Sequence, residues 1–222
     1  MMNDKDIRIA MKKLYSTDNS LMVDELAIPK KICLADLVRI PKDASSGMHG
    51  YEIKSEIDSL IRLESQVHYY SEVFQYCTLI VAEKHEKKAL ALIPDWWGVI
   101  VVVSKGFDVY GEILDKHILL EVRSALENPT ARSSYALTQL LWRTELLDII
   151  KKHELEVDKK ARKFVLRKGI VKHIPSTSLE QLTISYLVNR VDWKIPGVKP
   201  VYTRRKRTKT DSAKRKYRKK EK

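Results

Sequence analysis

The pattern of apolar and polar residues over the first hundred positions is typical of a sheet flanked by helices. Alternating or continuous apolar runs predict strands over 21–28, 32–40, 49–55 and 78–83. Apolar residues at steps of three and four predict helices over 6–15 and 57–76; the stripe of the second comprises Leu60, Leu63, Val67, Tyr70 and Phe74. A long helix crossing between two strands implies a mixed sheet.

The rest of the chain changes character near Asn128-Pro129-Thr130. Before this point we expect a short strand over 89–93 and a hairpin of 98–104 with 107–113. After it, apolar periodicity predicts helices over 135–153 and 157–167, and Thr177-Ser-Leu-Glu180 has the pattern of a capping box that opens a third. The sequence therefore predicts an α/β core over 1–127, a helical module over 128–200 and a tail over 201–222.

The triplet Glu52-Ile53-Lys54 is the strongest candidate for chemistry. Side chains alternate along a strand, so Glu52 and Lys54 lie on the same face. If Asp36 on the preceding strand faces the same way, two carboxylates and a lysine converge, which suits Mg²⁺ beside a scissile phosphate. The alternative interpretation of this common pattern is a solvated salt bridge.

Neighbouring residues strengthen the first interpretation. Asp36 stands inside an apolar strand, where a carboxylate is costly unless it is paired or binds a metal. Glu25 has a similar setting, with a surface acid on an edge strand as its alternative. Gln66 and Tyr70 are four residues apart and share a helix face, which forms either core or the border of an active centre.

The order of an acid, an aspartate, Glu-x-Lys and a helix with Gln-x-x-x-Tyr resembles the PD-(D/E)xK, restriction-endonuclease-like nuclease superfamily. The stretches Asp58–Gln66 with Tyr70, and Ile93-Pro-Asp-Trp-Trp-Gly98, also resemble a family of small, poorly characterised bacterial and phage proteins of predicted nuclease character. The resemblance implies a restriction-endonuclease-like core of order α-β-β-β-α-β with a mixed sheet, and a Mg²⁺ or Mn²⁺ cofactor.

The same resemblance assigns roles to residues. It makes Asp36 and Glu52 metal ligands, the Ile53 carbonyl a third ligand and Glu25 an auxiliary ligand, while Lys54 orients or deprotonates the attacking water and stabilises the phosphorane charge. Gln66 and Tyr70 contact DNA or support the site. Two departures stand out: Leu34 replaces a common arginine, for which Lys30 or Lys31 could substitute, and Ala35 replaces the proline of the superfamily name.

Charge supports a nucleic-acid partner. Of the formal net charge of +13, residues 203–222 supply most, with twelve Lys/Arg against two acids. This tail, which begins with Arg204, Arg205, Lys206 and Arg207, lacks apolar periodicity, so we expect it to be disordered and to bind polyanions through counterion release. A solubilising tail, or a patch for RNA or acidic lipid, is the alternative.

Other sequence features narrow the class of protein to which the chain can belong. No apolar run approaches the roughly 18 residues of a membrane span, and no Walker or G-x-G-x-x-G loop occurs. Cys33 and Cys77 lie in apolar surroundings typical of reduced cysteines in a cytoplasmic protein. Trp96-Trp97 is expected to anchor a loop rather than to wedge into nucleic acid, and Trp142 with Arg143 and Glu145 to form a helix–helix contact.

These observations favour a Mg²⁺-dependent nuclease that hydrolyses phosphodiester bonds of DNA, in a phage or other mobile element. The alternative is a catalytically inactive nucleic-acid-binding or partner-scaffold protein on the same fold. The sequence leaves open the oligomeric state, DNA against RNA, and cleavage from ends against internal cleavage.

Overall fold

The computed structural model describes residues 3–28, 33–43, 46–103, 118–191 and 193 of the chain. The chain divides into two compact units, residues 1–192 and 193–222. The described helices and strands all belong to the first unit, and Trp193 is the one described residue of the second. The expected tail, with Arg204–Arg207, lies outside the described residues, as do Lys30 and Lys31.

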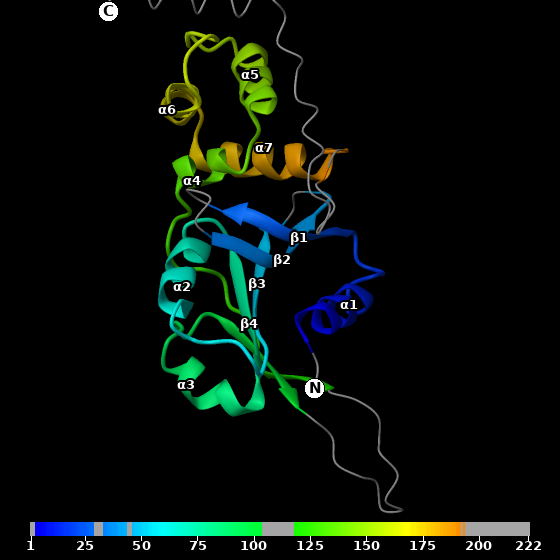
Figure 1. Ribbon diagram of the computed structural model, residues 1–222. Coiled ribbons are helices and arrows are strands. Elements are labelled where there is room, and N and C mark those ends of the chain that lie inside the picture. The colour runs from blue at the N-terminus through cyan, green and yellow to red at the C-terminus, as the bar shows by residue number, and fades with distance from the viewer. Residues whose placement is uncertain (1–2, 29–32, 44–45, 104–117, 192, 194–222) are drawn as a thin grey trace, which may run out of the picture. The chain divides into compact units, whose positions relative to one another are not determined.

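A six-stranded mixed sheet forms the centre of this unit (Figure 1). Its strands follow each other in chain order: β1 (Ser20–Ile28), β2 (Cys33–Pro41), β3 (His49–Lys54), β4 (Tyr76–Ala82), β5 (Gly98–Val103) and β6 (Ile118–Arg123). The pairs β3–β4 and β4–β5 are parallel and the other three are antiparallel. The predicted mixed α/β architecture is therefore confirmed, and the order of the first six elements is the expected one.

Helices α1 (Asp4–Leu14) and α2 (Leu63–Ser71) lie on opposite faces of the sheet (Figure 1). Ile7 and Met11 of α1 are fully buried in a core with Leu37, Tyr51, Ile53 and Ile80. A capping box at Asn3, with Asp6 as its reciprocal partner, begins α1. On the other face, α2 carries side chains that contact Glu52, which points away from that core.

Helix α2 approaches β3 closely because position 50 is a glycine. A Cβ built on Gly50 would lie 2.4 Å from Phe74 Cδ2 and 2.9 Å from Tyr70 Cδ1. Both distances are shorter than van der Waals contact, so any larger residue would push the end of α2 outward. Gly50 thus fixes how near the Tyr70 side chain lies to the middle of β3.

Four further helices follow the sheet: α4 (Ser134–Gln139), α5 (Arg143–Lys152), α6 (Lys163–His173) and α7 (Ser176–Val188). The last three bury a common apolar core that includes Leu146, Ile150, Leu166 and Leu179. The predicted boundary at Asn128 is not a loose linker, because the Asn128 side chain donates hydrogen bonds to the carbonyls of Ser71 and Phe74. None of the described helices is long and apolar enough to cross a membrane.

Several predicted elements need correction. Residues 89–93 do not form a strand: after the short 3-10 helix η2 (Glu83–His85), α3 (Glu86–Leu90) includes positions 89 and 90, and residues 91–93 form a turn. The helix expected over 57–76 is shorter, because residues 55–62 form turns in which the Asp58 carboxylate accepts bonds from the Ser55 N–H and hydroxyl. The partner of β5 is β6, whereas 107–113 lies outside the described residues.

The helical module also differs in its breaks. The helix predicted over 135–153 is divided because Trp142 is extended and its N–H bonds to Glu145, which begins a new helix. The second helix lies over 163–173 instead of 157–167. The third begins at Ser176 after Pro175 with no side-chain cap, and the Glu180 expected in a capping box pairs with Arg132 at 3.0 Å.

The aromatic residues behave as anchors, as predicted. Trp97 is fully buried and its ring centroid lies 5.5 Å from that of Tyr70. Trp142 lies under the Arg190 guanidinium, which also pairs with Glu145 at 2.6 Å. The Trp97 contact anchors the loop before β5 to α2, and the Trp142 and Glu145 contacts join the start of α5 to Arg190, which follows α7.

Candidate active site

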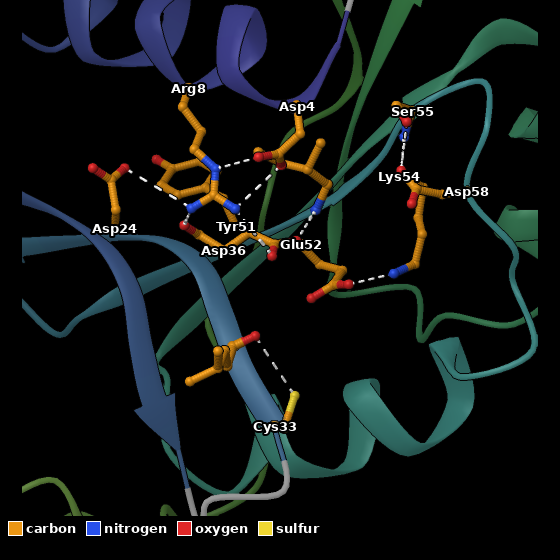
Figure 2. A network of polar contacts seen from close by, with 12 residues as sticks. Asp4, Arg8, Asp24, Cys33, Asp36, Tyr51, Glu52, Lys54, Ser55 and Asp58 are labelled. Carbon is orange, nitrogen blue, oxygen red and sulfur yellow. Dashed lines mark hydrogen bonds and ion pairs between the residues drawn. The ribbon is translucent and has the colours of Figure 1, made fainter. Parts of the chain in front are cut away.

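Asp36 and Glu52 lie opposite each other on neighbouring antiparallel strands. The register pairs Leu37 with Tyr51 and Val38 with Gly50, so the next position brings Asp36 against Glu52. Residues directly opposite in an antiparallel pair project to the same face. Both line one cavity of about 400 Å³, together with Asp4, Arg8, Cys33, Leu34, Ile53, Lys54, Asp58, Arg62, Ser65, Gln66 and Tyr69. The predicted convergence of Asp36, Glu52 and Lys54 is therefore present in the geometry (Figure 2).

Glu52 is buried and held by several donors. Lys54 Nζ and Gln66 Nε2 each lie 2.5 Å from Glu52 Oε1, and the Tyr70 hydroxyl lies 2.7 Å from Oε2. Glu52 is 1% exposed and Lys54 is 4% exposed. The pair is thus not the solvated salt bridge that was the alternative interpretation of Glu-x-Lys. A buried pair needs additional hydrogen bonds to offset desolvation, which Gln66 and Tyr70 supply.

The side-chain amide of Gln66 supports Glu52 with its nitrogen and leaves its oxygen without a partner. Its Nε2 donates to Glu52, while its Oε1 is buried and has no hydrogen-bond partner among the described residues. A buried acceptor without a donor is costly, so this oxygen is suited to a water or substrate group. The helix spacing predicted that Gln66 and Tyr70 share a face, and both side chains do reach Glu52.

Asp36 is held from two sides. Its Oδ2 accepts a hydrogen bond of 2.8 Å from the Ile53 N–H, and Arg8 Nη2 lies 3.4 Å from its Oδ1 (Figure 2). Arg8 also donates to the Asp36 carbonyl and pairs with Asp4 at 2.7 Å. Helix α1 therefore places a guanidinium beside the residue of β2 that precedes its pairing with β3.

The pKa of Asp36 is raised to about 7. Burial is the largest cause and the negative charge of Glu52 is the next; the Ile53 N–H and Arg8 act in the opposite direction. Two carboxylates in one low-dielectric cavity disfavour each other's ionisation. The same surroundings, burial first and then Glu52 and Asp36, raise the pKa of the Cys33 thiol to about 12, so this thiol stays protonated.

Arg8 and Arg62 are cations of the cavity that the sequence patterns did not indicate. Arg62 is exposed, lines the cavity, and forms no ion pair with any described residue. It precedes Gln66 by four positions, so helical spacing could have placed it on the same face. Arg8 carried no such signal, because only the packing of α1 against the sheet brings it to Asp36.

Glu25 is not brought to this cavity. Its side chain is exposed and its backbone has a φ of 52°, a left-handed conformation that interrupts the alternation of β1. The acid of β1 that approaches the site is its neighbour Asp24, which pairs with Lys12 and lies 4.0 Å from Arg8 Nη1.

Comparison with known families gives a match over most of the chain. A model of the family described as Bacteriophage P4 protein cII matches residues 7–196. The chain belongs to this bacteriophage P4 cII family. No curated protein and no solved structure matches the chain. Membership agrees with the expected kinship to a phage family, but the description names no activity, so the nuclease resemblance and the restriction-endonuclease-like core stay proposals.

The oxygen ligands that this cII-family chain offers in the cavity are suited to a hard cation, although they are few. Among the described residues no three His, Cys, Asp or Glu side chains form a group that could hold a metal ion. Four acids line the cavity, but Asp4 pairs with Arg8 and Asp58 accepts bonds from Ser55, so Asp36 and Glu52 are the candidate ligands. The Ile53 carbonyl leaves the same strand edge as the N–H that binds Asp36. Mg²⁺ commonly uses one or two carboxylates and completes its shell with water and substrate oxygens. A divalent cation would also relieve the repulsion that raises the pKa of Asp36.

Proposed function

We propose that this cII-family chain is a metal-dependent nuclease that hydrolyses phosphodiester bonds of DNA. The observation that carries the proposal is the convergence of Asp36, Glu52 and Lys54 from adjacent strands in one cavity. The raised pKa of Asp36 adds support, because groups with strongly perturbed pKa values that line a cleft are enriched at functional sites.

Five of the residues that line the cavity have roles at the reacting phosphate in this proposal. Asp36 and Glu52, with the Ile53 carbonyl, would hold Mg²⁺ or Mn²⁺, which when bound supplies Lewis-acid stabilisation and an activated water. Lys54 would stabilise the negative charge that develops on the phosphate. The unpaired Oε1 of Gln66 would accept a hydrogen bond from the attacking water.

Arg62 takes the place of the arginine that superfamily relatives carry where this chain has Leu34. Arg62 lines the cavity and has no ion-pair partner in the described part of the chain. Arginine binds phosphate bidentately, so Arg62 is the proposed contact of the scissile or adjacent phosphate. The net charge of +13 gives the chain a general attraction to nucleic acid.

Cleavage of supercoiled plasmid and linear duplex DNA with Mg²⁺ or Mn²⁺ tests the proposal. We expect Lys54→Met and Glu52→Gln to reduce cleavage by about 10²-fold or more, because they remove transition-state stabilisation and a metal ligand. Lys12→Met is the matched control for the lysine, since Lys12, like Lys54, pairs with a carboxylate but lies outside the cavity. Glu25→Gln is the matched control for the acid.

Equal activity in Lys54→Met and Lys12→Met would refute the catalytic role. Parallel reactions with single-stranded DNA and RNA decide the substrate, and cleavage of RNA alone would overturn the assignment to DNA.

The second candidate is a nucleic-acid-binding or partner-scaffold protein in which the acidic set is retained but inactive. It is favoured by the saturation of Glu52, whose two oxygens already accept bonds from Lys54, Gln66 and Tyr70. This candidate predicts DNA binding that is unchanged by Mg²⁺ and by Glu52→Gln, without cleavage of any nucleic acid.

A further inference from the structure

A second cavity of about 400 Å³ lies on the face of the sheet that carries α1. Its walls come from the end of α1 and from five strands, and none of its lining residues also lines the carboxylate cavity. Its volume is within the range of small-molecule sites. Tyr51, which is 1% exposed, and Ile100 belong both to this wall and to the α1-side core.

Four aromatic rings form a row along this cavity: Tyr15, Tyr51, His49 and Tyr76. His49 stacks on Tyr51 with centroids 4.2 Å apart and planes 7° from parallel. Tyr15 lies 6.1 Å from Tyr51 and Tyr76 lies 5.8 Å from His49, so these two half-buried rings end the row. Such a row offers flat, polarisable surface to a planar ring.

The polar groups in the wall are nearly all neutral or paired. Burial, and next Arg39, lower the pKa of His49 to about 3, so its ring is neutral, and its Nε2 lies 2.8 Å from Thr78 Oγ1. Arg39 pairs with Asp18 at 2.9 Å and its guanidinium lies 5.0 Å from the centre of the Tyr15 ring. The cavity therefore lacks an unpaired cation in the described wall and is a poor site for phosphate.

Two groups remain for a ligand. The buried hydroxyl of Tyr51 lies close enough to Tyr15 to interact with it electrostatically, but it has no hydrogen-bond partner of normal geometry among the described residues. Burial, and next Tyr15, raise the pKa of Tyr51, so this hydroxyl stays a donor. At the rim, the exposed Glu121 forms no ion pair with any described residue and is an acceptor.

We propose that this cavity binds a nucleobase, stacked on the aromatic row with an acceptor atom toward the Tyr51 hydroxyl and an amino group toward Glu121. A planar, uncharged ring that combines an acceptor with an exocyclic amine matches this wall, and adenine, cytosine and guanine have that chemistry. The base belongs either to a free nucleoside or to an unpaired nucleotide of a strand. The proposal goes beyond nuclease activity and holds whether or not the carboxylate cavity cleaves DNA.

The test titrates the full chain with deoxyadenosine, observed by saturation-transfer NMR, and with a short deoxyadenylate oligonucleotide at about 0.3 M salt, where phosphate-driven binding is reduced. Tyr51→Phe removes only the unpaired hydroxyl and should weaken binding about three- to tenfold, the loss of one neutral hydrogen bond. Ser124→Trp adds bulk at the exposed rim and should weaken binding more than tenfold. Tyr135→Phe is the control, because Tyr135 is also half-buried but lines neither cavity.

Weakened deoxyadenosine binding in Tyr51→Phe supports a nucleoside site. If Tyr51→Phe weakens oligonucleotide binding and free deoxyadenosine does not bind at all, the result supports a base presented by a strand. If neither ligand responds to Tyr51→Phe and Ser124→Trp, the proposal is wrong. Tyr51→Phe deletes one oxygen without changing shape, so it remains a valid test even if Ser124→Trp does not fold.

Discussion

The hydroxyl of Tyr70 lies 2.7 Å from Oε2 of Glu52 and is the point at which helix α2 supports the carboxylate cavity. The Tyr70 hydroxyl oxygen also accepts a hydrogen bond from the Asp36 N–H at 3.1 Å. One phenol on α2 therefore contacts both strands that carry the acids. Burial, and next the charge of Glu52, raise the pKa of Tyr70, so it remains a donor at neutral pH.

Tyr70→Phe should destabilise the fold by about 1–3 kcal/mol, because Glu52 Oε2 and the Asp36 N–H lose a shared partner in a buried place. Urea denaturation gives the change in the free energy of unfolding. Tyr69→Phe is the matched control, since Tyr69 is a half-buried neighbour on α2. Equal losses in the two variants would show that the Tyr70 hydroxyl does not support the acids.

Asp36→Asn should make the protein more stable at neutral pH. The pKa of Asp36 is about 7 in the folded chain and about 4 in an unfolded one, so the folded state binds this proton more tightly. The contribution of Asp36 to stability is therefore fully present below about pH 4 and is lost as the pH rises to about 7. In Asp36→Asn this loss disappears, and we expect a gain of about 1–3 kcal/mol over wild type at about pH 8.

Urea denaturation of both proteins at about pH 5 and about pH 8 checks this prediction. The difference between wild type and Asp36→Asn must grow with pH. A difference of constant size, or one that shrinks as the pH rises, would contradict the raised pKa.

Alternation along the strands was sufficient to predict much of the site. It located β1 to β5 and placed Glu52 and Lys54 on one face, and helical spacing placed Gln66 and Tyr70 together. It failed at Glu25, because a left-handed backbone turns that side chain into solvent. Alternation along one strand could not foresee a conformation that only the surrounding structure determines.

Other features depended on contacts between distant parts of the chain. Arg8 reaches Asp36 through the packing of α1 on the sheet, 28 residues away. The break between α4 and α5 contains neither glycine nor proline; it coincides with Trp142, which lies under Arg190. The apolar run at 89–93 is short, and short runs suit a strand or a helix equally well.

Binding of Mg²⁺ should release protons. With a pKa of about 7, Asp36 is about half protonated at pH 7, and a carboxylate must ionise to ligate a cation. Calorimetric titration in buffers of different ionisation enthalpy should therefore report about half a proton released per ion at pH 7 and almost none at about pH 9. Glu52→Gln removes both a ligand and the charge that raises the pKa of Asp36, so it should weaken binding and reduce the release. Binding without proton release would place the ion elsewhere.

Gly50→Ala should impair the site by displacing α2 from β3. The new Cβ would meet the Phe74 ring at 2.4 Å and displace the end of α2, which carries the Tyr70 hydroxyl. We expect a loss of stability of about 1–3 kcal/mol. We also expect DNA cleavage to fall by more than the loss of folded protein explains. Gly169→Ala is the matched control, because its Cβ would meet Val157 at the same distance within the helical module. Comparable cleavage in the two variants at equal folded fraction would disprove the link between Gly50 and the site.

Deletion of residues 203–222 should separate DNA affinity from catalysis. The segment holds twelve Lys/Arg and two acids, and its sequence has no apolar face to bury, so the thermal midpoint of the truncated chain should be close to that of the full chain. Binding isotherms at several salt concentrations should show a shallower slope of log K against log salt, by less than the limit of about 0.9 per lost cation, since not all twelve contact phosphate together. Cleavage at saturating DNA should survive, because Asp36, Glu52 and Lys54 remain. A charge-matched chain in which the segment is shuffled should retain the full slope if the tail acts only through its charge. An unchanged slope after deletion would mean that the tail does not hold nucleic acid.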